Sequence, residues 1–230
     1  LNRTAATRLY NTLVWGIFRE EDGEGWQIDL NGPDAPRRLC AHTVILANGA
    51  YDTPVAFPGW TLPGVITCGA ALTLLKNQRT APFKRVLVTG AGPLLFSAAA
   101  HLIDAGVEVV AVCEANRLQA QAVLYGPTFL REWHRVKEGA HYLTTMAQGR
   151  TPYKMGWSVL EARGNGQVEE AVIGPLNNDQ IPMSGRQQTL QVDAVICGYG
   201  LTPNTGLARM AGCQMEYIPK KGGWIPRRAE

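Results

Sequence analysis

The chain has 230 residues, of which 46% are hydrophobic and 18% are charged. This balance excludes a disordered chain and predicts a globular protein with a substantial core. The formal net charge is only +3 and no block of basic residues occurs, so no nucleic-acid-binding surface is expected.

The most apolar stretch, residues 86–113, is long enough to suggest a transmembrane helix. Pro93, Asp104 and Glu108 interrupt it, and a strand, a turn, a helix and a second strand explain it better. The sequence therefore predicts no membrane span.

The five cysteines are widely scattered, and no CxxC pair occurs among them. Their spacing excludes a zinc knuckle and a thioredoxin-type redox pair, and no metal site is expected. Because free thiols persist in reducing compartments, the cysteines predict a cytoplasmic protein.

The N-terminal part of the chain has the alternating pattern of β structure. Residues 12–18 and 26–30 flank a turn, which predicts a hairpin. Residues 42–49 form a short apolar run that ends in glycine, and this run predicts a strand buried on both faces. Prolines and glycines between residues 53 and 65 predict a crossover between domains, followed by a short helix at residues 70–76.

The middle of the chain predicts a βαβ unit with two parallel strands. Residues 86–89 predict a strand, residues 90–92 a tight turn, residues 93–105 a helix, and residues 107–113 the second strand. This order is typical of an α/β, Rossmann-like nucleotide-binding domain.

The rest of the domain is predicted to mix helices with short strands. The elements expected, in chain order, are a helix at 117–136, a third parallel strand at 141–146, an antiparallel β-meander at 155–162, 167–173 and 189–192, and a buried return strand at 193–197.

One motif in this domain points to chemistry. Gly90-Ala91-Gly92-Pro93-Leu94-Leu95 lies between the predicted strand and helix, where a dinucleotide fingerprint belongs. Gly90 permits a tight turn, and Gly92 lets a pyrophosphate approach the backbone. The helix N-terminus then offers unpaired N–H groups to the phosphates. Pro93 suits the first helical turn.

Glu114 ends the second strand, about 20 residues beyond the glycines, where a carboxylate accepts hydrogen bonds from ribose hydroxyls. Such a carboxylate disfavours a 2′-phosphate and so favours NAD(H) over NADP(H), although Arg117 keeps NADP(H) open. Leu95 stands where the fingerprint has its third glycine, so the loop could also bind its nucleotide poorly or serve only as scaffold.

Four segments together resemble the two-dinucleotide flavoproteins of the pyridine nucleotide-disulfide oxidoreductase type. Residues 44–49 resemble their "ATG" strand, with Asn48 in place of threonine, and residues 193–204 resemble the second such strand. Between them lie residues 57–65 (FPGWTLPGV) and the 90–95 loop, which are most similar to the flavoprotein subunits of opine oxidases, hydrogen cyanide synthase and D-hydroxyproline dehydrogenase. The resemblance covers residues 12–226.

The resemblance implies an internal fragment of such a flavoprotein. Residues 1–65 would be a partial flavin-domain segment, residues 66–205 the Rossmann-like domain, and residues 206–230 the return to the flavin domain. Because no flavin-binding GxGxxG precedes residue 43, FAD is expected only in the full-length parent, and the fragment alone is expected to be inactive.

The resemblance also implies a set of nucleotide-contacting residues and a function. The cofactor-binding residues expected are Gly90, Ala91, Gly92, Pro93, Leu94, Glu114, Ala115, Gly198, Tyr199, Gly200, Ala47, Asn48 and Gly49. They would bind NAD(H) or another adenine nucleotide, in an FAD-dependent protein that oxidises an amine, imino acid or opine together with a second subunit.

Two other functions remain open at this point. One is a non-catalytic adenine-nucleotide or subunit-contact module, and the other is an NAD(P)H-dependent flavoprotein reductase. No catalytic residue is assigned, because the segments that would face the flavin ring are expected to lie mostly outside this chain. Cys68 has no base nearby in the sequence to make a thiolate, and a structural thiol is favoured.

Overall fold

The computed structural model describes residues 6–21, 23–116 and 133–227, and the chain folds into two compact units. One unit comprises residues 52–200, and the other comprises residues 1–51 with 201–230. We call the first the nucleotide unit, after the Rossmann-like nucleotide-binding domain that the sequence predicts there, and the second the flanking unit. The domain boundaries predicted at 65/66 and 205/206 stay predictions.

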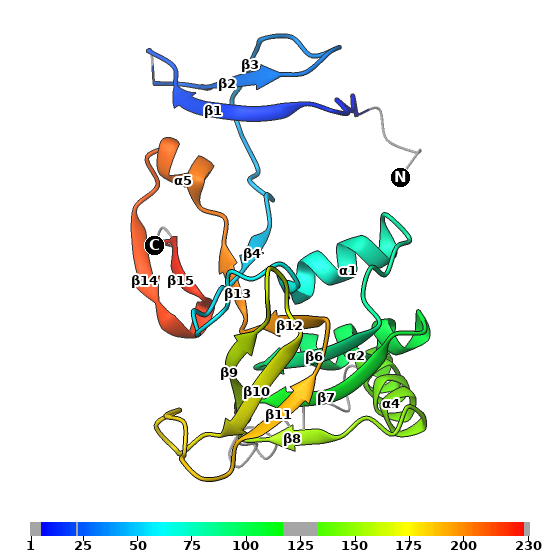
Figure 1. Ribbon diagram of the computed structural model, residues 1–230. Coiled ribbons are helices and arrows are strands. Elements are labelled where there is room, and N and C mark those ends of the chain that lie inside the picture. The colour runs from blue at the N-terminus through cyan, green and yellow to red at the C-terminus, as the bar shows by residue number, and fades with distance from the viewer. Residues whose placement is uncertain (1–5, 22, 117–132, 228–230) are drawn as a thin grey trace. The chain divides into compact units, whose positions relative to one another are not determined.

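The nucleotide unit is built on a five-stranded parallel sheet with the strand order β5-β12-β6-β7-β8 (Figure 1). Its strands are β5 (Val65–Thr67), β6 (Arg85–Gly90), β7 (Glu108–Glu114), β8 (Tyr153–Met155) and β12 (Ala194–Gly198). The helices of the unit are α1 (Cys68–Lys76), α2 (Leu94–Asp104) and α4 (Trp133–Gln148). The predicted α/β fold and the parallel βαβ unit are confirmed.

Alternate residues of the central strands face two different cores. Val86 and Val88 pack with α1 and α2 on one face, whereas Leu87 packs against the antiparallel strands on the other. All three are fully buried. Successive side chains of a strand point to opposite faces, so a strand covered on both faces must be apolar throughout.

A three-stranded antiparallel meander covers the second face of this sheet (Figure 1). Its strands are β9 (Trp157–Arg163), β10 (Glu170–Pro175) and β11 (Gln188–Gln191). A turn at Gly164, Asn165 and Gly166 connects β9 to β10, as the sequence predicts. The meander thus completes a helix–sheet–sheet sandwich.

The prediction of a third parallel strand at residues 141–146 is wrong. These residues belong to α4, and the third strand of the βαβ series is β8, which pairs with β7. Thr145 and Met146 are buried while Leu143 is 58% exposed, a one-sided pattern that suits a helix packed on α2. The predicted helix at 117–136 falls outside the described residues except for its last residues, which lie in α4.

The flanking unit has small antiparallel sheets. The predicted hairpin is confirmed: β1 (Leu13–Arg19) pairs with β2 (Trp26–Asn31), and β3 (Arg38–Ala41) extends the sheet. The remaining elements are β4 (Ala50–Asp52), β13 (Leu201–Pro203), α5 (Gly206–Met210), β14 (Met215–Ile218), the 3-10 helix η1 (Pro219–Lys221) and β15 (Gly223–Pro226).

The prediction of a buried strand at residues 42–49 is also wrong. No sheet pairing is formed by residues 43–49, and Ile45 is 88% exposed. An apolar run becomes a buried strand only when neighbouring strands pair with it and other layers cover it. The described part of the chain supplies neither for this run.

Candidate functional site

The candidate site lies at the carboxyl ends of β6 and β12, the two neighbouring strands at which the order of the sheet reverses. From β6 the chain proceeds to β7 and β8 on one side, and it returns to β12 on the other. Open α/β sheets bind their ligands in the crevice outside such a switch point. A hollow of about 490 Å³ lies here and is lined by Ala91, Ala115 and Tyr199 among others.

The turn after β6 requires both of its glycines. A Cβ on Gly90 would lie 2.1 Å from the carbonyl oxygen of Gly198, and the Ala91 N–H donates to that same oxygen at 2.8 Å. Gly92 has a φ of +95°, and a Cβ there would point into open space. Gly90 therefore holds the turn against β12, while Gly92 leaves room for a ligand beside the backbone.

The N–H group of Gly92 is not free, contrary to the prediction of bare amides in this turn. It donates to Glu114 Oε2 at 3.0 Å, and the Asn116 N–H donates to Glu114 Oε1 at 3.0 Å. The Glu114 side chain is buried, with 4% of the residue exposed. A buried carboxylate needs hydrogen-bond donors, and these two backbone amides are the ones that β6 and β7 place beside it.

The environment of Glu114 shifts its proton affinity. Burial raises the pKa of this carboxyl above its ordinary value of 4.5, although the hydrogen bonds from the Asn116 and Gly92 amides each lower it. Desolvation is the largest of these effects, so the folded protein holds the Glu114 proton more tightly than the unfolded chain does.

Leu95 occupies the position where a dinucleotide fingerprint has its third glycine. The side chain is fully buried, and its Cδ2 atom would lie 3.1 Å from a Cβ on Gly198. The absence of a side chain at Gly198 thus makes room for Leu95 beside the end of β12. Pro93 precedes α2 as its N-cap residue and makes no side-chain cap bond, and Leu94 begins the helix.

Three hydroxyl groups that the sequence did not single out as a set meet beside the turn. Tyr199 was a predicted site residue, but Thr89 and Ser158 were missed. The Tyr199 hydroxyl lies 2.6 Å from Ser158 Oγ and 3.3 Å from Thr89 Oγ1. Ser158 lies on β9 of the meander, 41 residues from Tyr199, so no local sequence signal connects them.

The structure brings ten of the predicted cofactor residues into the nucleotide unit at this end of the sheet. They are Gly90, Ala91, Gly92, Pro93, Leu94, Glu114, Ala115, Gly198, Tyr199 and Gly200. The other three, Ala47, Asn48 and Gly49, belong to the flanking unit. There Asn48 Nδ2 donates to the carbonyl oxygen of Asn204 at 2.7 Å, and the Asn204 N–H donates to the carbonyl oxygen of Gly49 at 3.0 Å.

Cys68 has the properties of a structural thiol. It is fully buried at the start of α1, where the Thr67 side chain accepts a hydrogen bond from the Ala70 N–H and caps the helix. Burial raises the pKa of the Cys68 thiol to about 12, with smaller contributions from Cys197 and Asp52. A thiol with this pKa holds its proton at neutral pH, which is unfavourable for a nucleophile.

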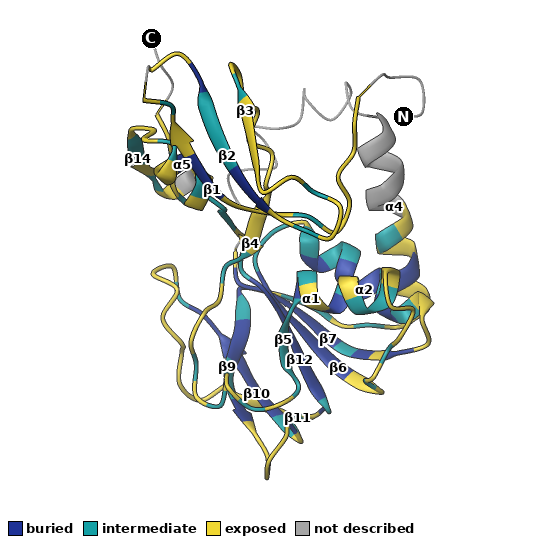
Figure 2. Cartoon of the chain, turned by 90° about the horizontal axis from the view of Figure 1, so that it is seen from above, coloured by how far each residue is buried: buried dark blue, intermediate teal, exposed yellow. Residues whose placement is uncertain are grey.

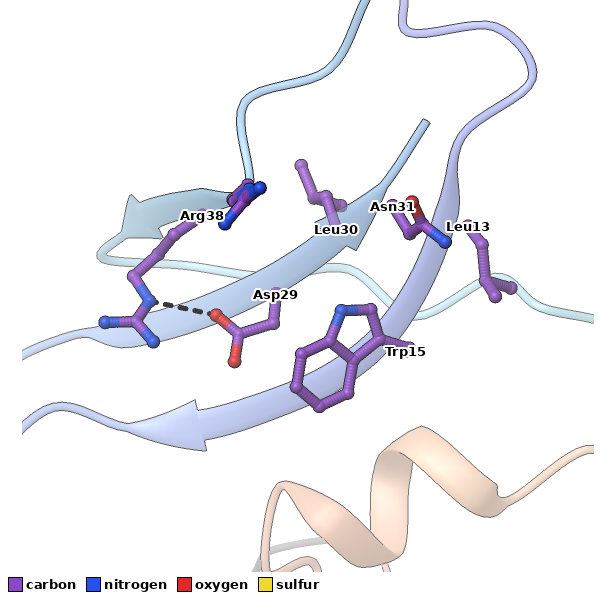
Figure 3. Close-up of a pocket in the computed structure, with 7 residues that line it drawn as sticks. Leu13, Trp15, Asp29, Leu30, Asn31 and Arg38 are labelled. Carbon is purple, nitrogen blue, oxygen red and sulfur yellow. Dashed lines mark hydrogen bonds and ion pairs between the residues drawn. The ribbon is translucent and has the colours of Figure 1, made fainter. Parts of the chain in front are cut away.

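The flanking unit has a hollow of its own, of about 740 Å³, on the β1–β3 sheet (Figure 3). Trp15 and Leu13 line its apolar part, and the buried carboxylate of Asp29 is paired with Arg38 at 2.9 Å. Its described lining residues include no glycine turn and no helix N-terminus, which distinguishes it from the hollow at the switch point.

Two further kinds of feature are absent from the described ranges. No group of three or more His, Cys, Asp or Glu side chains is arranged to hold a metal ion. Among the same residues, no helix combines the length and the apolarity that crossing a bilayer requires.

The sequence of the chain matches a known protein family. The family model described as pyridine nucleotide-disulphide oxidoreductase matches residues 15–225. The chain belongs to this family. Its members are FAD- and NAD(P)-dependent oxidoreductases, so the predicted resemblance is confirmed.

Individual relatives in this oxidoreductase family agree with the resemblance. Hydrogen cyanide synthase subunit HcnB of Pseudomonas aeruginosa is 30% identical over 174 residues, which cover 74% of this chain and 37% of the relative. An opine oxidase subunit of Agrobacterium tumefaciens is 28% identical over 220 residues, or 93% of this chain and 41% of the relative. The chain therefore spans about 40% of the length of the curated relatives that it matches.

A solved structure supports the fold. The crystal structure of L-proline dehydrogenase from P. horikoshii has a TM-score of 0.57 to this chain and 19% sequence identity, with coverage of 95% of this chain and 33% of the other. At this identity the likeness establishes the fold alone.

Proposed function

We propose that the nucleotide unit binds NAD(H) or another adenine nucleotide at the switch point between β6 and β12. The observation that carries the proposal is the open space beside Gly92, at the N-terminal end of α2 and next to the 490 Å³ hollow. A phosphate group can approach the backbone only where no side chain intervenes, and the helix N-terminus favours its negative charge.

Glu114 supplies the second half of this site. Its carboxylate lies at the end of β7, beside the turn, where the ribose of a nucleotide would be placed. A carboxylate accepts hydrogen bonds from the two ribose hydroxyls and repels a 2′-phosphate. This favours NAD(H) over NADP(H).

We propose further that the complete protein is the flavoprotein subunit of an oxidoreductase that oxidises an amine, imino acid or opine. The support is the similarity to hydrogen cyanide synthase subunit HcnB and to opine oxidase, whose matching chains are both named as subunits. FAD bound in the complete protein would accept a hydride from the carbon that carries the substrate nitrogen, and a second subunit would complete the enzyme. The nucleotide unit would bind and orient its nucleotide and exclude water from it.

A second function is favoured by two specific observations. The Glu114 carboxylate already accepts the hydrogen bond that the Gly92 N–H could donate to a phosphate, and Leu95 replaces the third glycine of the fingerprint. Both features weaken a dinucleotide site. A non-catalytic adenine-nucleotide site or a subunit-contact module is therefore the alternative.

Calorimetric titration of the chain with NADH, NADPH and ATP separates these functions. Tight binding of NADH supports the dinucleotide site and is the result that a reductase requires. Binding of ATP alone supports the non-catalytic nucleotide site. If no binding heat is measured with any of the three ligands, the subunit-contact module without a nucleotide is the function that remains.

A matched pair of glycine variants locates the site. Gly92 and Gly106 both have positive φ angles, +95° and +81°, and both would place a Cβ in open space. Because only Gly92 faces the proposed phosphate position, Gly92→Ala is expected to weaken nucleotide binding at least tenfold, and Gly106→Ala is expected to leave it unchanged. Equal affinities in the two variants would show that the nucleotide does not bind at this turn.

A further inference from the structure

The hollow at the switch point is lined by uncharged side chains. Phe57, Pro58, Val159 and Leu176 form apolar parts of its wall, and none of its described lining residues is Asp, Glu, Lys, Arg or His. An ionised group placed here would lose water without gaining a partner of opposite charge. The hollow therefore suits the uncharged end of a nucleotide, such as a base or a nicotinamide ring, better than its phosphates.

The hydroxyl groups of Thr89, Tyr199 and Ser158 form a chain beside this hollow in which either oxygen of each pair can donate, and the Val159 N–H at Thr89 favours one direction. Thr89 is fully buried, and its Oγ1 atom accepts a hydrogen bond from the Val159 N–H at 3.2 Å. Within the described ranges, the Tyr199 oxygen at 3.3 Å is the acceptor that the Thr89 hydroxyl proton can reach. If Thr89 donated to no acceptor, the proton of a buried hydroxyl would be left without a hydrogen bond, which is unfavourable.

This direction continues from Tyr199 to Ser158. In the direction set at Thr89, Tyr199 accepts from Thr89 and donates its own proton to Ser158 Oγ, which lies 2.6 Å away. Burial raises the pKa of Tyr199, which keeps its hydroxyl protonated and able to donate. In this arrangement Ser158 Oγ accepts a hydrogen bond from Tyr199. The Ser158 hydroxyl proton is then available to donate to a ligand in the hollow.

We infer that Ser158 is a specificity-determining residue of this hollow and donates its hydroxyl proton to an acceptor atom on a neutral, planar group of the ligand. The inference rests on the proposed nucleotide function and deepens it. The acceptor is a carbonyl oxygen or an unprotonated ring nitrogen, which both the carboxamide of a dihydronicotinamide and the adenine base provide. Ser158, Tyr199 and the apolar wall together form the recognition surface, and the backbone amide of Val159 sets the direction in which the chain donates.

The test compares NADH with ADP-ribose, which has the adenine but lacks the nicotinamide, by calorimetric titration of the full chain and of Ser158→Ala. Loss of one hydrogen bond predicts about five- to tenfold weaker binding in the variant. A loss for NADH alone places the nicotinamide ring in the hollow, and an equal loss for both ligands places adenine there. Each of these results supports the role of Ser158.

Control variants separate recognition from folding. Ser158→Thr keeps a hydroxyl and is expected to restore binding, whereas Ser97→Ala makes the same hydroxyl deletion on α2, outside the hollow, and is expected to have no effect on binding. Thermal unfolding of each variant checks that the fold is intact. Unchanged affinity of Ser158→Ala for both ligands overturns the inference and leaves the nucleotide site standing. Failure of the unaltered chain to bind either ligand overturns both.

Discussion

The nucleotide unit and the flanking unit differ in how completely they bury their apolar residues. In the nucleotide unit, two clusters of buried side chains cover both faces of the parallel sheet, and the strands β6, β7 and β12 are buried along most of their length (Figure 2). In the described part of the flanking unit, the buried hydrophobic residues are Ile17, Leu30 and Ala208. The same unit exposes Trp15, Ile45, Tyr217 and other large apolar side chains.

This difference indicates which unit carries its own stability. A sheet covered on both faces gains hydrophobic free energy from each strand, whereas a two- or three-stranded sheet with exposed apolar residues gains little. We therefore expect the nucleotide unit to be the stable part of this chain. Leu13 and Trp15, which line the hollow of the flanking unit, are among its exposed residues.

The largest expected effect is on the free energy of unfolding, and it is found by comparing a leucine-to-alanine substitution in each of the two units. Leu95→Ala removes a fully buried side chain and is expected to lower the free energy of unfolding by about 2–5 kcal/mol, because a cavity remains in the core. Leu13→Ala, at a side chain that is 61% exposed, is expected to change it by no more than about 0.5 kcal/mol. Denaturant unfolding measures both, and equal losses would remove the contrast between the units.

A smaller loss is expected from overfilling the site next to Leu95. A Cβ on Gly198 would lie 2.7 Å from Cys68 Sγ and 3.1 Å from Leu95 Cδ2, so Gly198→Ala is expected to cost about 1–3 kcal/mol. Because Leu95→Ala vacates part of this space, the double variant is expected to lose less than the sum of the single losses. Strict additivity in a double-mutant cycle would contradict the reciprocal fit of Leu95 and Gly198.

A pH-dependent effect is expected from Glu114. The pKa of this carboxyl is raised in the folded protein, so the unfolded chain releases the proton first as pH rises above 4.5. Stability therefore falls as pH rises from the unfolded pKa to the folded pKa, and the cost persists above that window. Glu114→Gln is expected to remove this part of the pH dependence, as measured by urea unfolding from acidic to neutral pH.

The control for Glu114 is Glu108→Gln. Glu108 is exposed and pairs with Arg85 at 2.9 Å. Its substitution is expected to leave the fall in stability above pH 4.5 in place. The interpretation of Glu114 fails if both variants change the pH profile alike.

The smallest perturbation is chemical labelling of the thiols, which needs no substitution. Cys40 and Cys213 of the flanking unit are exposed, whereas Cys68, Cys113 and Cys197 of the nucleotide unit are buried. Burial raises the pKa of each of the three buried thiols to about 12. Two of the five thiols are therefore expected to react with a disulfide reagent at neutral pH before unfolding. Cys213 should react first, because a hydrogen bond with Glu20 raises the pKa of Cys40.

Prediction from the sequence succeeded where several independent local signals agreed on the same element. A strand, a glycine turn, a helix and a second strand follow one another at residues 85–114, and periodicity and turn chemistry agree for each of them. It failed for residues 42–49 and 141–146, both short runs with several apolar residues. Such runs fit a strand or a buried helix equally well, and only neighbouring elements decide between them.

The sequence by itself determined the turn at the candidate site, because the positive φ of Gly92 and the close approach at Gly90 both require glycine. Only the tertiary structure decided which groups these backbone atoms meet. Glu114 reaches the Gly92 amide from 22 residues away, and Thr89 meets Val159 and Tyr199 across 70 and 110 residues. Hydrogen bonds depend on positions within a few tenths of an ångström, and those positions arise from the packing of the whole sheet and meander rather than from any local stretch of the chain.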